Sequence, residues 1–215
     1  QGAFSLFFRK LPRTTAVLPY FEREASFETN DTLLNDILHT AAYTLKLCMQ
    51  NDFVWDGIKR DRVVWCGDLH PELLTSLYRF GRTPNMDNAL AFLAESTPAD
   101  TWMNTIPSYS AWWVINLCDM IAFTGDRTLL DTYGDYARRV IAHIASYVQE
   151  NGDFDFGLER SYFLDWSTAD HPEAQAGVAA QFMMMAEKFL GLEENADCRL
   201  LLARLARYTA GETTL

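Results

Sequence analysis

The chain has 215 residues, 49% of them hydrophobic and 13% aromatic, which is enough to build the packed core of one domain. Its formal net charge of −11 argues against a nucleic-acid partner and against an anionic membrane surface, since both attract basic proteins. No apolar run approaches the roughly 20 residues that cross a bilayer, so no membrane span is expected.

Two regions are distinguished along the chain. Residues 1–29 are predicted to form an extended lead-in, or the end of a preceding β-rich domain, because prolines interrupt their short apolar stretches. From residue 30 the pattern is helical, and apolar residues recur at helical spacing over 33–45, with Asn30 or Asp31 as a cap. We therefore expect residues 30–215 to form one helical domain.

Further helices follow in chain order. Proline is favoured in the first turn of a helix and glycine just after its end, and these two residue types mark several of the boundaries. The predicted helices cover 70–80, 84–93, 108–123, 126–150, 170–189 and 195–209. The sequence therefore indicates an all-α fold.

Long polar and aromatic segments alternate with short turns between these helices. The long segments are 50–69, 96–107 and 151–170, and two of them run into a helix through a similar Asp-His-Pro-Glu motif. If helix pairs are arranged around a ring, such segments gather at one end of it, where sites are commonly built. A superhelical array of helix pairs gives much the same pattern, so both arrangements remain open.

The cysteines do not indicate a metal or a disulfide framework. They are widely spaced, with no Cys-x-x-Cys pair and no cluster with histidine: Cys48, Cys66, Cys118 and Cys198. We expect no metal site and no cofactor.

The segment 55–68 has the composition of a sugar site. Hydrolysis of a glycosidic bond needs one carboxylic acid that keeps its proton and one carboxylate, and indole faces stack on sugar C–H surfaces. The segment supplies acids, bases and indoles together: Asp56, Asp61, Asp68, Arg60, Arg62, Trp55 and Trp65. The simpler interpretation is a structural loop whose charged residues form surface ion pairs, and the chemistry alone does not choose between the two.

Two more clusters combine aromatic residues with polar ones. One holds Asp155, Glu159, Asp165 and Trp166, and the other holds Trp102, Tyr109, Trp112 and Trp113. At least one of the adjacent tryptophans on the apolar helix is expected to lie in the core. His70 and His171 each precede a proline and are interpreted as helix-entry residues.

Residues 56–68 read Asp-Gly-Ile-Lys-Arg-Asp-Arg-Val-Val-Trp-Cys-Gly-Asp, and this order and spacing resembles the signature of α-L-rhamnosidase-type glycoside hydrolases of family 78. The resemblance covers residues 20–190. It implies an (α/α)6-barrel (toroid) catalytic domain, inversion of the anomeric centre by water, and a rhamnose-containing glycan or glycoside as the substrate.

The resemblance also implies roles for single residues. Asp61 stands at the position of the general acid. Asp56, Arg60, Trp65 and Asp68 match residues that hold the rhamnose; Trp112 and Trp166 are looser matches to aromatic residues of that pocket, and Asp165 adjoins the latter.

The chain departs from the family pattern at two points. The acid of the family is usually glutamate, and Asp61 is one methylene shorter. The base of the family is a glutamate of the later half of the barrel, and none of the candidates in this chain, Glu159, Asp165 and Glu173, matches it by position. We therefore expect about the first half of the ring, with the base missing and the piece alone inactive.

Two alternatives stay open beside this interpretation. One is a non-catalytic or degenerate helical domain that binds carbohydrate, and the other is a helix-repeat scaffold in which Trp65, Asp56 and Asp68 lie apart. An open half-ring also exposes apolar helix faces, so self-association of the fragment is expected.

Overall fold

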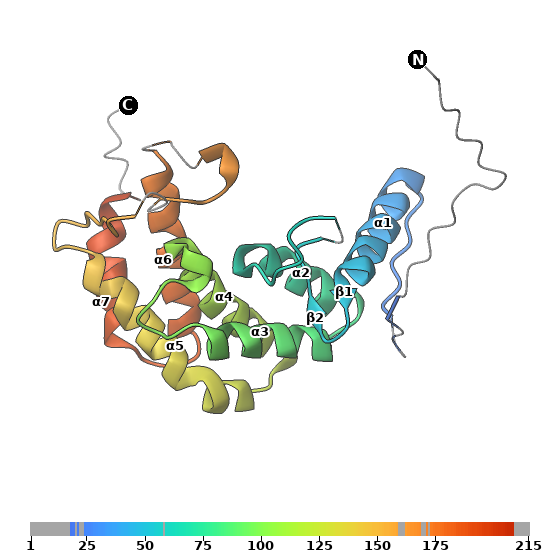
Figure 1. The fold of residues 1–215 in the computed structure, drawn as a ribbon, viewed down its shortest axis with the longest axis horizontal. Helices are drawn as coiled ribbons and strands as arrows, with labels where there is room; N and C mark the ends of the chain where they lie inside the picture. The colour runs from blue at the N-terminus through green and yellow to red at the C-terminus, as the bar shows by residue number, and fades with distance from the viewer. Residues whose placement is uncertain are drawn as a thin grey trace, which may run out of the picture.

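The computed structural model describes residues 18–19, 21, 24–57, 59–158, 162–168, 171 and 173–208. These residues are mostly helical, which confirms the all-α class (Figure 1). The α-helices are α1 (Thr32–Cys48), α2 (Cys66–Arg79), α3 (Pro84–Ser96), α4 (Pro107–Thr124), α5 (Thr128–Tyr147), α6 (Ala174–Leu190) and α7 (Ala196–Leu205). Short elements add 3-10 turns η1 (Met103–Thr105), η2 (Trp166–Thr168) and η3 (Ala206–Tyr208), and an antiparallel hairpin of β1 (Met49–Gln50) and β2 (Phe53–Val54).

Most helix boundaries follow from local chemistry. Asp31 caps α1 by accepting the N–H groups of Leu33 at 2.9 Å and Leu34 at 3.3 Å. Proline occupies the first position of α3 and of α4, where its missing N–H costs nothing. Gly125 ends α4 at φ 71°, a left-handed conformation that glycine adopts without strain.

The start of α2 differs from the prediction. The helix begins at Cys66 and not near residue 70, so Pro71 lies inside it. The side-chain oxygen of Asn104 accepts the N–H of Cys66 at 2.9 Å, and the Asn104 amide donates to the carbonyl of Val64 at 3.2 Å. This cap comes from a distant segment, and it allows a helix to start where no local residue can cap it. His70 is therefore a mid-helix residue and not the helix-entry residue that we predicted.

Several other predicted segments lie partly outside the described residues, and one short element was not predicted. The predicted lead-in 1–29 lies mostly outside them; its stretch 24–29 carries neither helix nor strand, and the N–H of Ala25 donates to Arg79 O at 2.7 Å. The β1–β2 hairpin within 50–69 was not predicted. Asp170 and Pro172, at the start of the predicted helix 170–189, lie outside the described residues, and α6 begins at Ala174.

The helices form an inner row, with α4 at its centre, and an outer layer. The inner helices α2 and α6 pack on either side of α4, while α3, α5 and α7 lie against the outside of this row, and α1 packs on α2 (Figure 1). Helix α4 is buried along nearly its whole length, and Trp113 in it is fully buried. The long segments before α2, α4 and α6 all lead into the N-terminal ends of these inner helices, which places them at one edge of the row.

The core also accounts for residues with other possible roles. All four cysteines are buried and free. Trp102 packs on His143 with ring centroids 4.3 Å apart, so the predicted aromatic group around Trp112 is divided between two places. Over the residues that the structure describes, no group of acidic, histidine or cysteine side chains could hold a metal ion. No described helix has the length and apolar character that crossing a bilayer requires.

Candidate active site

The three long segments are tied together at the N-terminal ends of α2, α4 and α6. Asn104 joins the segment before α4 to the one before α2, as described above. The hydroxyl of Ser108 donates to the carbonyl of Phe163 at 2.5 Å, and Gln181 of α6 donates to Ser108 O at 2.9 Å. These buried bonds hold the three segments in one arrangement, because breaking any of them leaves unsatisfied polar groups.

Asp56 organises the loop between β2 and α2. Its side chain has 0% exposure, and its two oxygens accept the backbone N–H groups of Asp61 at 3.3 Å and Val63 at 3.1 Å. Arg60 lies 3.4 Å from the same carboxylate. The aspartate therefore fixes the curvature of the loop from within, and it does not belong to the residues that line the neighbouring pocket.

Arg60 links this loop to α2. Its Nη1 lies 2.9 Å from Oδ1 of Asp68, while its Nε faces Asp56, so one guanidinium bridges two carboxylates. The side chain of Arg60 is still 52% exposed. The hydrogen bond from Arg60 to Asp68 and the charge of Asp68 raise the pKa of the guanidinium further, and it keeps its charge at any physiological pH.

Asp61 lies at the exposed side of the loop. Its Oδ2 accepts the indole N–H of Trp65 at 3.2 Å. The Trp65 ring in turn meets Tyr109 edge-on, with centroids 6.2 Å apart. Asp61, the residue predicted as the general acid, is thus exposed and accepts a hydrogen bond from an indole. It adjoins the pocket without lining it.

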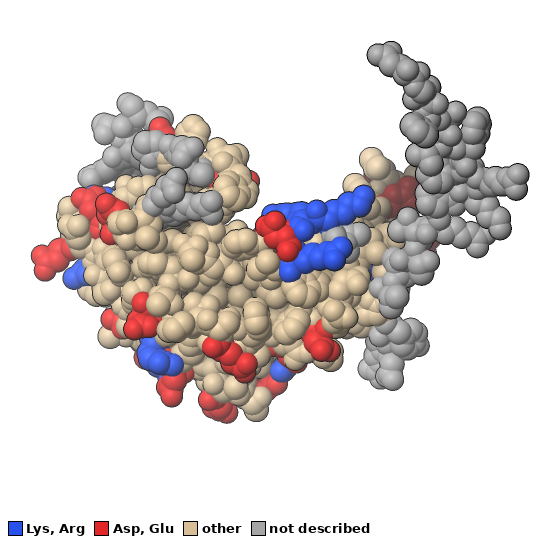
Figure 2. All heavy atoms as spheres, viewed as in Figure 1, with Lys and Arg blue, Asp and Glu red and all other residues tan. Residues whose placement is uncertain are grey.

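A pocket of about 480 Å³ lies between this loop and the segment before α6. Figure 2 shows the surface hollowed there, with basic side chains gathered over the β2–α2 loop at its edge. The pocket brings together five of the eight predicted site residues, and its lining is Arg60, Gly67, Asp68, Pro71, Tyr109, Trp112, Leu164, Asp165 and Trp166. Asp56, Asp61 and Trp65 support it from the loop.

The floor of the pocket depends on a close approach of α2 to α4. A Cβ atom on Gly67 would lie 2.5 Å from a ring carbon of Tyr109, so only glycine fits there. Burial raises the pKa of Tyr109 to about 12, and its hydroxyl stays protonated. Tyr109 belongs to an aromatic cluster that the sequence indicated, but nothing in the sequence placed it beside Gly67.

Trp112 is held by an array of hydrogen-bonded polar residues that joins three helices. Its ring stacks on His70 of α2 at 4.4 Å and 27°, and Nε2 of His70 lies 3.1 Å from Oδ2 of Asp119 on α4. Lys188 of α6 donates to the other oxygen of Asp119. Burial acts to raise the pKa of Asp119, but the hydrogen bonds from His70 and Lys188 outweigh it and keep that pKa below its usual value. No sequence pattern indicated this array, because its members are far apart in the chain.

Asp165 and Trp166 form the opposite wall. Asp165 is exposed, and its two oxygens accept the N–H of Trp166 at 2.8 Å and the hydroxyl of Ser167 at 3.3 Å. Trp166 is 65% exposed and meets the buried ring of Phe163 edge-on, with centroids 5.3 Å apart. An exposed indole that packs on a buried ring is suited to stacking against a sugar.

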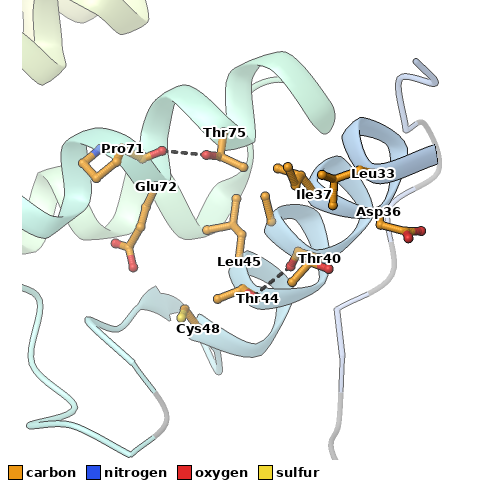
Figure 3. Close-up of a pocket in the computed structure, with 11 residues that line it drawn as sticks. Leu33, Asp36, Ile37, Thr40, Thr44, Leu45, Cys48, Pro71, Glu72 and Thr75 are labelled. Carbon is orange, nitrogen blue, oxygen red and sulfur yellow. Dashed lines mark hydrogen bonds between the residues drawn. The ribbon is translucent and has the colours of Figure 1, made fainter. Parts of the chain in front are cut away.

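Glu72 lies one helical turn beyond Asp68, outside this pocket. Its carboxyl is directed into a groove of about 580 Å³ between α1 and α2, where Leu45 and Cys48 lie near it (Figure 3). Burial, together with the charges of Asp68 and Asp56, raises the pKa of Glu72 to about 9, so this acid is neutral at pH 7. Sequence reasoning missed it, because only the fold brings apolar α1 against this face of α2.

The comparison with protein families decides the assignment. The model described as the bacterial α-L-rhamnosidase six-hairpin glycosidase domain matches residues 22–190. The chain belongs to this family. The matched range agrees with the expected range of 20–190. The match confirms the prediction of a glycosidase toroid domain and excludes the alternative of a helix-repeat scaffold.

Among solved structures, a rhamnosidase from Klebsiella oxytoca with rhamnose bound is similar, with a TM-score of 0.63 at 20% identity. The similarity covers 86% of this chain and 39% of that one, so the present chain spans well under half the length of that rhamnosidase. At 20% identity this similarity is evidence for a shared fold alone. No curated protein gave a significant match.

Proposed function

We propose that this domain binds a terminal α-L-rhamnosyl group in the pocket between the β2–α2 loop and η2. The observation that carries the proposal is the convergence of the Arg60–Asp68 pair with Trp112 and Trp166 on one hollow of about 480 Å³. A pyranose offers hydroxyl groups for the charged pair and C–H faces for the indoles. The rhamnose bound to the similar rhamnosidase supports the choice of sugar.

We further propose that Asp61 acts as the general acid of an inverting hydrolysis. In such a reaction one carboxylic acid protonates the leaving oxygen while a carboxylate roughly 6.5–9.5 Å away activates water. Asp61 adjoins the pocket on an exposed loop, where it can reach the glycosidic oxygen from the outer side. The loop that carries it is fixed from within by Asp56.

The base is proposed to come from outside these 215 residues. Asp165 uses both oxygens in its own turn, and Glu173 is exposed and faces His171 at 3.9 Å. Glu159 lies outside the described residues. Under this proposal the chain alone binds rhamnose but does not hydrolyse aryl α-L-rhamnosides.

The test separates binding from chemistry. Calorimetric titration of the chain with L-rhamnose is expected to show binding that Asp68→Asn weakens by about tenfold, because Arg60 loses its carboxylate partner at the pocket and keeps only Asp56. Hydrolysis of an aryl α-L-rhamnoside is expected only from a longer protein that includes the base. In that protein Asp61→Asn should abolish turnover, and NMR should detect the inverted anomer first.

A second candidate is a carbohydrate-binding domain without hydrolytic activity. The exposure of Asp61 and its place outside the pocket lining favour it. If the longer protein binds rhamnose but does not hydrolyse aryl α-L-rhamnosides, this second function stands, whereas turnover that Asp61→Asn abolishes excludes it.

A further inference from the structure

The groove between α1 and α2 has no part in the proposed function. It has a volume of about 580 Å³ and shares only Pro71 with the lining of the rhamnose pocket. Along α1 it extends from Leu33 to Cys48, which is about four turns of the helix. An elongated hollow of this kind suits a ligand with an extended apolar part.

Apolar side chains of α1 form one wall of the groove. They recur at four-residue intervals, which places them on one face of the helix: Leu33, Ile37, Ala41 and Leu45. Figure 3 shows Ile37 and Leu45 directed towards α2. An aliphatic chain that lies along this wall leaves water, and this transfer favours the binding of apolar groups.

The groove contains acids without bases. The hydroxyls of Thr44 and Thr75 each donate at 2.8 Å to the backbone carbonyl one turn earlier in their own helix, so these donors are already used. Two carboxyl groups belong to the lining, Glu72 beside the C-terminal part of α1 and the exposed Asp36 near its start. The described lining includes no lysine, arginine or histidine. The groove therefore lacks a cation to balance its acids.

Glu72 is the group that a ligand meets beside the C-terminal part of α1. Within the part of the chain that the structure describes, its carboxyl has no hydrogen-bond or ion-pair partner. The charges of Asp68 and Asp56 oppose its ionisation. Arg60 acts against them, but its guanidinium already bridges these two aspartates. The thiol of Cys48 stays neutral, because burial raises its pKa to about 11. The surroundings of Glu72 therefore favour a cation.

We propose that the α1–α2 groove binds a primary alkylammonium ion, with its aliphatic stem along α1 and its ammonium group on the carboxyl of Glu72. An ammonium group carries donors and no acceptor, so it matches a groove that offers carboxyl oxygens. Its charge is also opposite to the net charge of −11. An anion meets two acids there, and a neutral apolar ligand leaves Glu72 without a partner. The inference goes beyond the proposed function and does not depend on it.

Binding of the ammonium group is coupled to the release of a proton. The pKa of Glu72 is about 9, so its carboxyl is protonated at neutral pH, whereas a primary ammonium group keeps its proton up to about pH 10. When the two groups pair, Glu72 gives its proton to the solvent and becomes a carboxylate. The affinity should therefore rise with pH, by up to about tenfold per pH unit between about pH 7 and pH 9.

The first experiment compares ligands that share one stem. The chain is titrated calorimetrically at about pH 8 with hexylammonium, hexanol and hexanoate. Hexylammonium is expected to bind about tenfold or more tightly than hexanol, and hexanoate should bind most weakly. Each CH2 group added to the ammonium ion should tighten binding by about three- to fourfold, because it buries more apolar surface. Equal affinity for hexylammonium and hexanol, or no effect of stem length, overturns the proposal.

The second experiment replaces the acid. Glu72→Gln keeps the shape of the side chain, and Glu150→Gln, at an exposed position, is the matched control. Glu72→Gln is expected to weaken hexylammonium binding by about tenfold and to remove its pH dependence. It should also remove the proton release, which calorimetry in buffers of different ionisation enthalpy measures. Retained affinity or retained proton release overturns the proposal. Absent binding of L-rhamnose to the parent chain contradicts the proposed function alone.

The third experiment fills the groove. Thr44→Phe places a ring in it, and Thr132→Phe on α5 is the matched control, because both threonines are exposed and donate to a carbonyl one turn earlier. Titrations use a concentration at which sedimentation velocity shows a monomer. Thr44→Phe is expected to weaken hexylammonium binding by about tenfold or more, and Thr132→Phe should leave it unchanged. Unchanged binding in Thr44→Phe overturns the proposal. A monomer that binds no hexylammonium also overturns it and leaves the groove to a second copy of the chain.

Discussion

At the scale of single residues, the charged groups of the 55–68 segment have unequal roles. Asp56 is buried and accepts two backbone N–H groups, while Arg60 is half exposed and joins it to Asp68. The carboxylate that organises the loop is therefore separate from the groups that reach the pocket. The residue types alone do not reveal this difference, and the family resemblance placed Asp56 with Arg60 and Asp68 among the residues that hold rhamnose.

The stability of the chain should depend on Asp56. In Asp56→Asn an amide NH2 replaces one acceptor oxygen and meets a backbone N–H, so about 1–3 kcal/mol of the free energy of unfolding should be lost. Urea unfolding measures this loss, and Asp131→Asn, at an exposed position of α5, is the control. Rhamnose affinity should fall as well, because Arg60 loses one anchor. A variant of normal stability with lost binding would instead indicate direct contact between Asp56 and the sugar.

Glu72 predicts a pH dependence of stability. Its pKa in the folded chain is about 9, whereas in the unfolded chain it ionises near the ordinary carboxyl value of 4.5. Ionisation therefore favours the unfolded state, and the stability from this group falls as the pH rises from the lower pKa towards the higher one.

Replacing Glu72 tests this sign. Glu72→Gln should be more stable than the parent by about 1–3 kcal/mol at about pH 8, and the two should be equally stable at about pH 4. Urea unfolding at the two pH values measures this difference. Glu150→Gln, an exposed substitution, is the control. The same stability difference at both pH values would show that packing and not ionisation is responsible.

At the scale of elements, the sequence predicts helices well where local residues fix their ends. The predicted range 108–123 matches α4 closely because Pro107 and Gly125 bound it. It fails at α2, where the cap of Cys66 is a side chain from residue 104, and at the two-residue strands of the β1–β2 hairpin. The site shows the same division. The local motif indicates Arg60 and Asp68, and the family resemblance indicates Trp112, but the contacts of His70, Asp119 and Lys188 behind Trp112 become visible only with the fold.

The array of hydrogen-bonded polar residues that joins α2, α4 and α6 should position Trp112. His70→Ala removes the stacked ring and the bond to Asp119, so the indole should become mobile and rhamnose affinity should fall by about three- to tenfold. The indole N–H resonance of Trp112 should broaden or shift in NMR spectra, and Lys188→Met should shift it in part. His39→Ala, at an exposed position of α1, serves as the control. An unmoved resonance with weakened binding would mean that His70 contacts the sugar itself.

At the scale of the whole molecule, the two sides of the site differ in how firmly they are held. Helices α4 and α6 lie in a continuous core, whereas α1 packs chiefly on α2 and leaves an apolar groove beside it (Figure 3). The first helix exposes Leu33 at 67% and Ile37 at 55%, one helical turn apart. A contiguous apolar face of this kind favours association.

We therefore predict that the chain self-associates through α1. Sedimentation velocity over a range of concentrations should show a reversible dimer, because pairing two such faces removes apolar surface from water at a gain of about 25 cal/mol per Å². Leu33→Lys combined with Ile37→Glu should shift the dimerisation constant by about tenfold or more towards monomer. Phe123→Glu, an exposed apolar position at the end of α4, is the control and should leave the constant unchanged. A monomer at all concentrations, or equal effects of both substitutions, would exclude α1 as the interface.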